Sequence, residues 1–142
     1  MKRMILAALL LGCVNDDIRL YETQVMGSVS ATGKGTLHLE FHHAKTFGSG
    51  ALSHPLGLFD SRKVTLENLP YRFDETLLYP EQKGEGLVVY GWLDTDGDGV
   101  LCMPGKPAEP AGLVRVGDFP SHQVHTTLVL DENCAGPETL YP

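Results

Sequence analysis

The sequence predicts an all-β protein, built as a single antiparallel β-sandwich of about seven strands. Its 142 residues include 16 glycines and 9 prolines, which lie mostly between short apolar segments. Turn residues recur at intervals of about ten positions, as expected when short strands follow one another. No window carries the apolar stripe of an amphipathic helix, whereas several segments alternate between apolar and polar residues.

Three segments carry this prediction in the first two thirds of the chain. Residues 36–41 (TLHLEF) place three apolar side chains on one face and polar side chains on the other. Residues 62–68 (RKVTLEN) repeat the pattern, with Val64 and Leu66 facing inward. Residues 86–93 (GLVVYGWL) are apolar on both faces, which predicts a central strand covered on two sides.

The remaining segments complete the outline of one domain. Residues 122–130 (HQVHTTLVL), rich in β-branched side chains, predict a last long strand. Residues 45–55 and 79–86 are predicted loops because glycine, proline and polar residues gather there. Residues 14–25 are polar at first and predict a tether that enters the first strand.

The N-terminus has the pattern of an export signal. Lys2 and Arg3 precede an apolar run at residues 4–11 (MILAALLL), which would span only about 12 Å as a helix and is too short for a bilayer. The following LLGC, ending at Cys13, resembles the bacterial lipobox. This resemblance implies cleavage before Cys13 and acylation of that cysteine; the alternative is an ordinary signal peptide with a chance cysteine.

These features divide the chain into a lipoprotein signal peptide at residues 1–12, a lipidated tether at 13–20 and a β-sandwich domain at 21–142. Acyl chains on Cys13 would anchor the protein to a membrane of the bacterial cell envelope. In a Gram-negative host, Val14 after the lipidated cysteine would favour the outer membrane, by resemblance to lipoprotein sorting. Cleavage removes Lys2 and Arg3, so the formal charge changes from −7 to −9. Without a basic cluster, nucleic acid is excluded as a partner.

Cysteine use agrees with export. Of the three cysteines, lipidation of Cys13 leaves Cys102 and Cys134, and an even pair in an oxidising compartment predicts a disulfide. The alternative is a pair of soft metal ligands, but a second CxxC motif or a nearby histidine pair is missing from the sequence.

An aspartate-rich stretch, DTDGDG, follows the predicted central strand. Asp94, Asp96 and Asp98, with Gly99 after them, match the first six positions of a D-x-D-x-D-G calcium loop. An EF-hand is excluded because its twelfth position, which needs a bidentate glutamate, is Gly105 and because strands are predicted on either side.

The predicted ligands are therefore the three aspartates, Glu109 as a late carboxylate and the carbonyl of Val100. Their hard oxygen atoms suit Ca²⁺, which would have a structural role. The alternatives are a solvated acidic turn without an ion and a site for another metal.

The segment that contains this loop resembles a group of uncharacterised bacterial exported β-sandwich domains, similar to transthyretin-like and carboxypeptidase-regulatory-like domains. Their pattern is an apolar strand, D-x-N-x-N-G, and then G-x-P-x-E-x-x-G. Here it is matched by LVVYGWL and by the following residues: Asp94, Asp96, Asp98, Gly99, Gly105, Pro107, Glu109 and Gly112. Aspartates replace the asparagines, and Cys102 stands where a further acid is usual. The resemblance implies an immunoglobulin- or transthyretin-like sandwich and export, with no agreed activity.

The six histidines offer a second hypothesis, a periplasmic copper- or zinc-binding protein. His38 and His42 share a strand face but lie about 13 Å apart along an extended strand, so a shared ion would need a cross-strand partner such as His125. The plainer alternative is a set of polar-face histidines without metal.

Catalysis has little support in the sequence, so we expect a protein that is not an enzyme. Ser49 lies in FGSGA, which fails the G-x-S-x-G pattern. The pair Ser53-His54 has only Asp60 nearby as a candidate acid partner, which leaves a hydrolase as an unfavoured third hypothesis. The favoured hypothesis is a lipid-anchored binding or assembly module with a structural calcium loop, whose partner is an unknown envelope protein or ligand.

Overall fold

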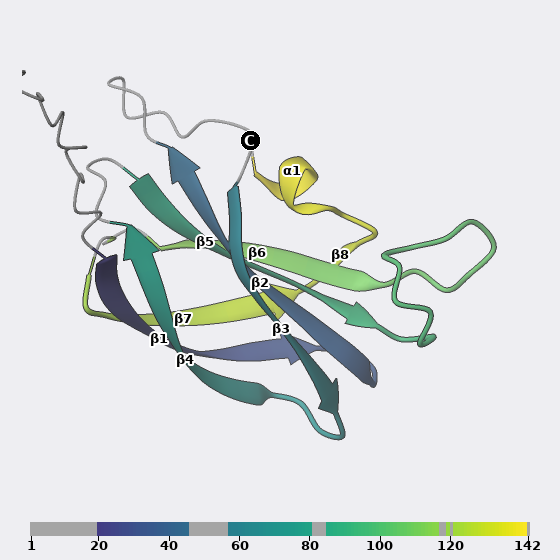
Figure 1. Ribbon diagram of the computed structural model, residues 1–142. Helices are drawn as coiled ribbons and strands as arrows, with labels where there is room; N and C mark the ends of the chain where they lie inside the picture. The colour runs from purple at the N-terminus through teal and green to yellow at the C-terminus, as the bar shows by residue number, and fades with distance from the viewer. Residues whose placement is uncertain (1–19, 46–56, 81–84, 117–118, 120, 142) are drawn as a thin grey trace, which may run out of the picture.

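Eight β-strands in two facing sheets and one short helix make up the described part of the chain (Figure 1). The structure, a computed structural model, describes residues 20–45, 57–80, 85–116, 119 and 121–141. The elements are β1 (Leu20–Ala31), β2 (Gly35–Lys45), β3 (Gly57–Leu66), β4 (Tyr71–Pro80), β5 (Glu85–Asp94), β6 (Pro110–Val116), β7 (Gln123–Leu130), β8 (Glu132–Asn133) and α1 (Pro137–Leu140). The predicted all-β sandwich is confirmed.

The strands form a three-stranded sheet in the order β4-β1-β7 and a five-stranded sheet in the order β3-β2-β5-β6-β8. The prediction of a purely antiparallel sandwich is wrong at one pair, because β1 and β7 run parallel, with Gln24 opposite Gln123. The other strand pairs that the structure describes are antiparallel. A tight hairpin forces its two strands to be antiparallel, but no hairpin joins β1 to β7, so their direction is set by the packing of the whole domain.

The predicted alternation of β2 positions the core. Leu37, Leu39 and Phe41 are fully buried between the sheets, and His38 and His42 face the other side of β2. On the three-stranded sheet, Val25, Val29, Phe73, Leu77, Val124 and Leu128 complete this core. The alternation of apolar and polar residues therefore decides which side of each strand is buried in the core.

Strand β5 is central and is buried on both faces, as its sequence predicts. Leu87, Val89 and Leu93 face the other sheet, and a second apolar group, which includes Tyr90 and Trp92, faces outward. This outer face is covered by the segment that carries α1, which is drawn in yellow beside β5 and β6 in Figure 1.

The covering segment, residues 134–141, is held by three kinds of contact. The hydroxyl of Tyr90 donates a 2.9 Å hydrogen bond to the carbonyl of Ala135. The ring of Tyr141 is buried against Val88, and the guanidinium of Arg115 lies 4.6 Å from its centroid. Burial raises the pKa of both tyrosine hydroxyls, so they stay neutral.

The two sides of the sandwich are closed differently. On one side, Gly112 of β6 lies so close to β7 that a Cβ atom would be 2.0 Å from the carbonyl oxygen of Val129. On the other side, Arg62 of β3 bonds to Asp60 and, at 2.9 Å, to Glu75 of β4. Arg62 and Glu75 are paired with inward-facing residues of their neighbouring strands. Inward-pointing charges of this kind protect edge strands from pairing with other chains.

Several predicted boundaries differ from the observed ones. Strand β3 begins five residues before the predicted start at 62 and ends at Leu66, and β4 and β6 were not predicted as separate strands. The predicted loop at 45–55 lies almost wholly outside the described residues, as do the signal peptide and most of the tether. Among the described residues, no helix has the length and apolar composition that a membrane span requires.

Candidate metal centre

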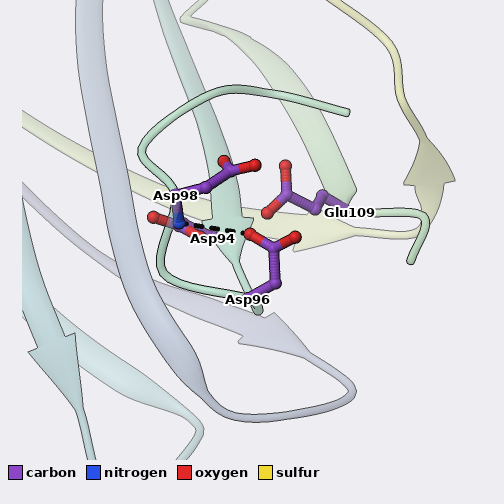
Figure 2. Close-up of side chains that lie close together, drawn as sticks. All are labelled: Asp94, Asp96, Asp98 and Glu109. Carbon is purple, nitrogen blue, oxygen red and sulfur yellow. Dashed lines mark hydrogen bonds between the residues drawn. The ribbon is translucent and has the colours of Figure 1, made fainter. Parts of the chain in front are cut away.

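The loop between β5 and β6 brings together the four carboxylates that the sequence singled out. Asp94, Asp96, Asp98 and Glu109 each offer one oxygen, and these oxygens all lie within 4.8 Å of one another. Figure 2 shows the four side chains turned toward a common centre, with Glu109 approaching from the side opposite to the aspartates. The prediction that Glu109 folds back onto the aspartates is therefore met in the structure.

Backbone amides of the loop itself organise the first aspartate. Asp94 is the last residue of β5, and its two carboxylate oxygens accept hydrogen bonds from the N–H groups of Gly97 at 2.6 Å and Gly99 at 2.9 Å. These glycines have φ values of 79° and 76°, in the left-handed region that favours glycine. Space is not the reason for glycine here, because nothing lies within 4 Å of a Cβ atom added at either position.

The other two aspartates each cap the backbone two residues further on. Asp96 Oδ1 accepts the N–H of Asp98 at 3.1 Å, and Asp98 Oδ1 accepts the N–H of Val100 at 2.8 Å. Such turns are typical of aspartate in tight loops. These turns use only the Oδ1 atom of each carboxylate and leave Oδ2 to other partners.

Glu109 is the buried member of the cluster, with only 2% of its surface exposed. Its Oε1 accepts the N–H of Thr95 at 3.1 Å and its Oε2 accepts the N–H of Cys102 at 2.8 Å. The carboxylate therefore connects the start of the loop to its middle. Buried charged groups need such partners, and each oxygen retains a further lone pair for a cation.

The predicted disulfide between Cys102 and Cys134 is present and adjoins Glu109. The two Cα atoms are 5.4 Å apart, within the usual range for a disulfide. The N–H of Glu109 lies 3.2 Å from Cys102 Sγ, and the N–H of Cys134 donates a 2.9 Å hydrogen bond to the carbonyl of Glu109. The disulfide therefore fixes the backbone on both sides of the buried glutamate.

Lys106 is a residue of the site that the sequence analysis missed. Its Nζ lies 3.1 Å from Asp96 Oδ2 and 3.9 Å from Asp98 Oδ2. The hydrogen bond to Lys106 lowers the pKa of Asp96, and the same bond raises the pKa of Lys106. The loop thus supplies part of its own counter-charge. A signal existed in GKPAEPAG, where a lysine lies three residues before the predicted ligand Glu109.

This arrangement could hold one metal ion. Four converging carboxylates are hard, negatively charged ligands, the kind that divalent calcium prefers. The Lys106 side chain is 48% exposed, so its flexible stem can swing into solvent when a cation enters. The Val100 carbonyl stays a predicted ligand, and the N–H of the same residue bonds to Asp98.

The one tryptophan of the sequence, Trp92, is linked to the cluster through a histidine. Trp92 stacks on His38 with ring centroids 3.9 Å apart, and His38 Nε2 lies 4.0 Å from Asp94 Oδ2. Burial, followed by the nearby charge of Lys63, lowers the pKa of His38 despite the opposing effect of Asp94. Because Trp92 stacks on His38 and His38 lies beside Asp94, we expect the fluorescence of Trp92 to respond to a cation at this site.

The structure does not bring together the histidines of the transition-metal hypothesis. His38 and His42 lie on the outer face of the five-stranded sheet, where His42 Nε2 is 2.9 Å from Glu40 Oε2. His125 lies on β7, in the other sheet, beside Met26. Within the described part of the chain, the acidic cluster is the group whose side chains converge for a metal ion.

Other predicted residues are also placed. Asp60, the candidate acid partner for a serine–histidine pair, bonds instead to Arg62. Ser49, Ser53, His54 and the lipidation residue Cys13 lie outside the described residues.

Comparisons with known proteins identify no family for this chain. No family model and no curated protein matches it, so the resemblance to exported transthyretin-like domains stays a prediction. Among solved structures, a match is found to an alternative pilotin from the type II secretion system of Vibrio cholerae. The identity is 11% and the TM-score is 0.47, and the match covers 82% of this chain and 100% of that one. Inferences about function therefore rest on the residues of this chain.

Proposed function

We propose that this chain is a lipid-anchored β-sandwich of the bacterial cell envelope that binds one calcium ion in its β5–β6 loop and works as a binding or assembly module. The observation that carries the calcium assignment is the convergence of Asp94, Asp96, Asp98 and Glu109 within 4.8 Å. The disulfide supports an oxidising location. The LLGC sequence supports an anchor at Cys13.

The calcium ion has a structural role in this proposal. Asp94 ends the central strand β5, and Glu109 directly precedes β6. An ion bound between them would hold the loop in one conformation, as the backbone hydrogen bonds to the same carboxylates already do. The ion would therefore stabilise the surface that the loop presents rather than take part in a reaction.

The placement of the loop supports a contact role. Asp94 lies opposite Thr36, at the end of the sandwich where β1 has already turned into β2. In Figure 1 the loop extends at the right, whereas β1 begins at the left. Strand β1 has 12 residues, a length of about 36–40 Å in a strand. Because an anchor at Cys13 would precede β1, the calcium loop would point away from the membrane, where another envelope component could reach it.

The calcium assignment is tested by titration of Trp92 fluorescence and by thermal melting. The chain carrying Cys13→Ser is melted with excess chelator and then with about 1 mM calcium. Extracellular modules bind calcium with Kd values of about 10⁻⁴–10⁻³ M. A Kd of about 0.1 mM would add about 1.4 kcal/mol to the free energy of unfolding and raise the Tm by several degrees.

Two double variants make this experiment specific. Asp96→Asn with Asp98→Asn should abolish the calcium effect. Glu67→Gln with Asp131→Asn removes the same formal charge from exposed positions outside the loop. This double variant should keep the calcium effect. If the unsubstituted loop shows neither a change in Tm nor heat of binding, the stretch is an acidic turn neutralised by Lys106.

The anchor is tested separately by fractionation and by incorporation of radiolabelled palmitate. We expect the unmodified chain to sediment with membranes and to carry label, and Cys13→Ala to do neither. Release of both proteins into the soluble envelope fraction would contradict the anchor without affecting the calcium assignment.

A further inference from the structure

An open hollow of about 740 Å³ lies on the outer face of the three-stranded sheet, away from the acidic cluster. It is formed over the middle of β1, the start of β4 and the first half of β7, whose inner faces belong to the core. Its volume is in the range of small-molecule sites. Its lining combines polar side chains with apolar ones such as Met26 and Phe73, and the polar side chains raise the question of a ligand.

Strand register brings one row of hydrogen-bond donors across this hollow. Arg72 of β4 lies opposite Ser28 of β1, and Ser28 lies opposite Thr127 of β7. His125 lies two residues from Thr127, on the same face of β7. Neighbouring strands are about 4.8 Å apart, so a guanidinium, two hydroxyls and an imidazole border a single small area.

The nearest acid does not neutralise Arg72. Asp74 follows Arg72 by two residues on the same face, but both of its carboxylate oxygens accept hydrogen bonds from Gln24 Nε2, at 2.9 and 3.1 Å. Gln24 is itself oriented by Gln123, whose Nε2 lies 3.3 Å from Gln24 Oε1. This relay of amides holds the carboxylate toward Gln24, on the side of the hollow away from Ser28.

The guanidinium of Arg72 is consequently free. Within the described part of the chain, no ion pair or hydrogen bond engages it, although three other cationic side chains, Arg62, Lys106 and Arg115, have acidic or aromatic partners. Arg72 is exposed, so its guanidinium can be reached by a ligand from solvent.

We propose that this hollow binds a phosphate group, with Arg72 as the charged contact and Ser28, Thr127 and His125 as additional donors. A guanidinium can engage two oxygens of an oxyanion in a bidentate manner. Two hydroxyls and an imidazole N–H offer donors for further oxygens, which a phosphate has and a carboxylate lacks. The phosphate could belong to a phospholipid headgroup or to a soluble compound, since the recognising chemistry is the same.

The test uses the full chain carrying Cys13→Ser, so that no acyl chain binds lipid. Inorganic phosphate is titrated and followed by amide chemical shifts. We expect saturable changes confined to residues 26–28, 72–74 and 125–127. Arg72→Gln should weaken binding by about 10- to 100-fold, the effect of losing a charge-assisted hydrogen bond. The control Lys63→Gln removes one positive charge from an exposed position on the other sheet and should leave the affinity unchanged.

Vesicles distinguish the two sources of phosphate. Binding to phosphatidylglycerol vesicles that depends on Arg72 would identify a headgroup, and binding of inorganic phosphate without vesicle binding would identify a soluble ligand. The proposal is overturned if neither probe binds saturably, or if Arg72→Gln binds as well as the control. Because the shift map comes from the unsubstituted sheet, the result stands even if Arg72→Gln folds poorly.

Discussion

The backbone N–H of Cys102 donates a 2.8 Å hydrogen bond to Glu109 Oε2, so a disulfide cysteine and a buried carboxylate support each other directly. Glu109 returns its own N–H toward Cys102 Sγ at 3.2 Å. The covalent bridge to Cys134 and the acidic cluster are therefore parts of one structural unit. We expect a substitution in either part to alter the conformation of the other.

Replacing Glu109 by glutamine should destabilise the fold in the absence of any metal. The amide has one acceptor oxygen, so it can accept the N–H of Thr95 or of Cys102 but not both. Loss of a hydrogen bond to a charged group in a buried place should lower the free energy of unfolding by about 1.5–3 kcal/mol. Chemical denaturation with chelator present measures this, with Glu132→Gln in the exposed strand β8 as the control. Equal midpoints for the two variants would contradict the role given to Glu109.

Replacing Lys106 by glutamine should raise the calcium affinity, because its ammonium competes for Asp96 and Asp98. The comparison is made by calorimetry at constant ionic strength. An unchanged or lower affinity would show that the lysine and the ion do not share these oxygens.

The pH dependence of the free energy of unfolding, measured without calcium, should report on the ion pair between Asp96 and Lys106. The pKa of Asp96 is lowered in the folded protein, so its contribution is present above the usual value of 3.8 and is lost as pH falls through the folded value. The pKa of Lys106 is raised, so its contribution is present below 10.5 and is lost as pH rises through the folded value. The stability difference between the unsubstituted chain and Lys106→Gln should therefore form a plateau that declines at both extremes. A difference that does not vary with pH would argue against this ion pair.

Removal of the disulfide should loosen the covering segment. With Cys13→Ser as the background, Cys102→Ser with Cys134→Ser should lower the free energy of unfolding by about 2–5 kcal/mol. Because Cys134 begins the segment that buries Tyr141 and contacts Tyr90, limited proteolysis should cut residues 135–141 faster in this variant. Two free thiols in the unfolded, unreduced parent protein would show that the bridge does not form.

Gly112→Ala should be far more damaging than Gly136→Ala. The added methyl group at 112 would lie 2.0 Å from the carbonyl oxygen of Val129, whereas at 136 the nearest atom is a flexible carboxylate at 3.4 Å. We expect a loss of roughly 3 kcal/mol or failure to fold at position 112, and a change below about 0.5 kcal/mol at 136. Similar melting temperatures for both variants would mean that β6 and β7 are less tightly packed than the structure shows.

The predictions that succeeded from sequence depend on local patterns. Alternation in residues 36–41 decides the buried side of β2 whatever strand it pairs with. The two-sided apolar character of β5 similarly predicts its central place. The spacing of Asp94, Asp96 and Asp98 predicts their convergence, since alternate side chains of a tight loop point to one centre.

The features that were missed depend on contacts between distant residues. The parallel pairing of Gln24 with Gln123 joins strands from opposite ends of the domain, and no local pattern encodes a partner. Whether Lys106 returns to Asp96 depends on the path of the loop around the disulfide. The histidines of the transition-metal hypothesis lie in different sheets for the same reason: the order of the strands sets the distance between them.

The parallel pairing of β1 with β7 sets an order in which the domain can assemble. Contacts such as Gln24 with Gln123 join residues 99 positions apart. Strand β1 can therefore pair with β7 only when nearly the whole chain of the domain is present. Chains dominated by such long-range pairings fold slowly, in milliseconds to seconds. The three-stranded sheet β4-β1-β7 therefore stays incomplete until β7 is present, whichever other strands have already paired.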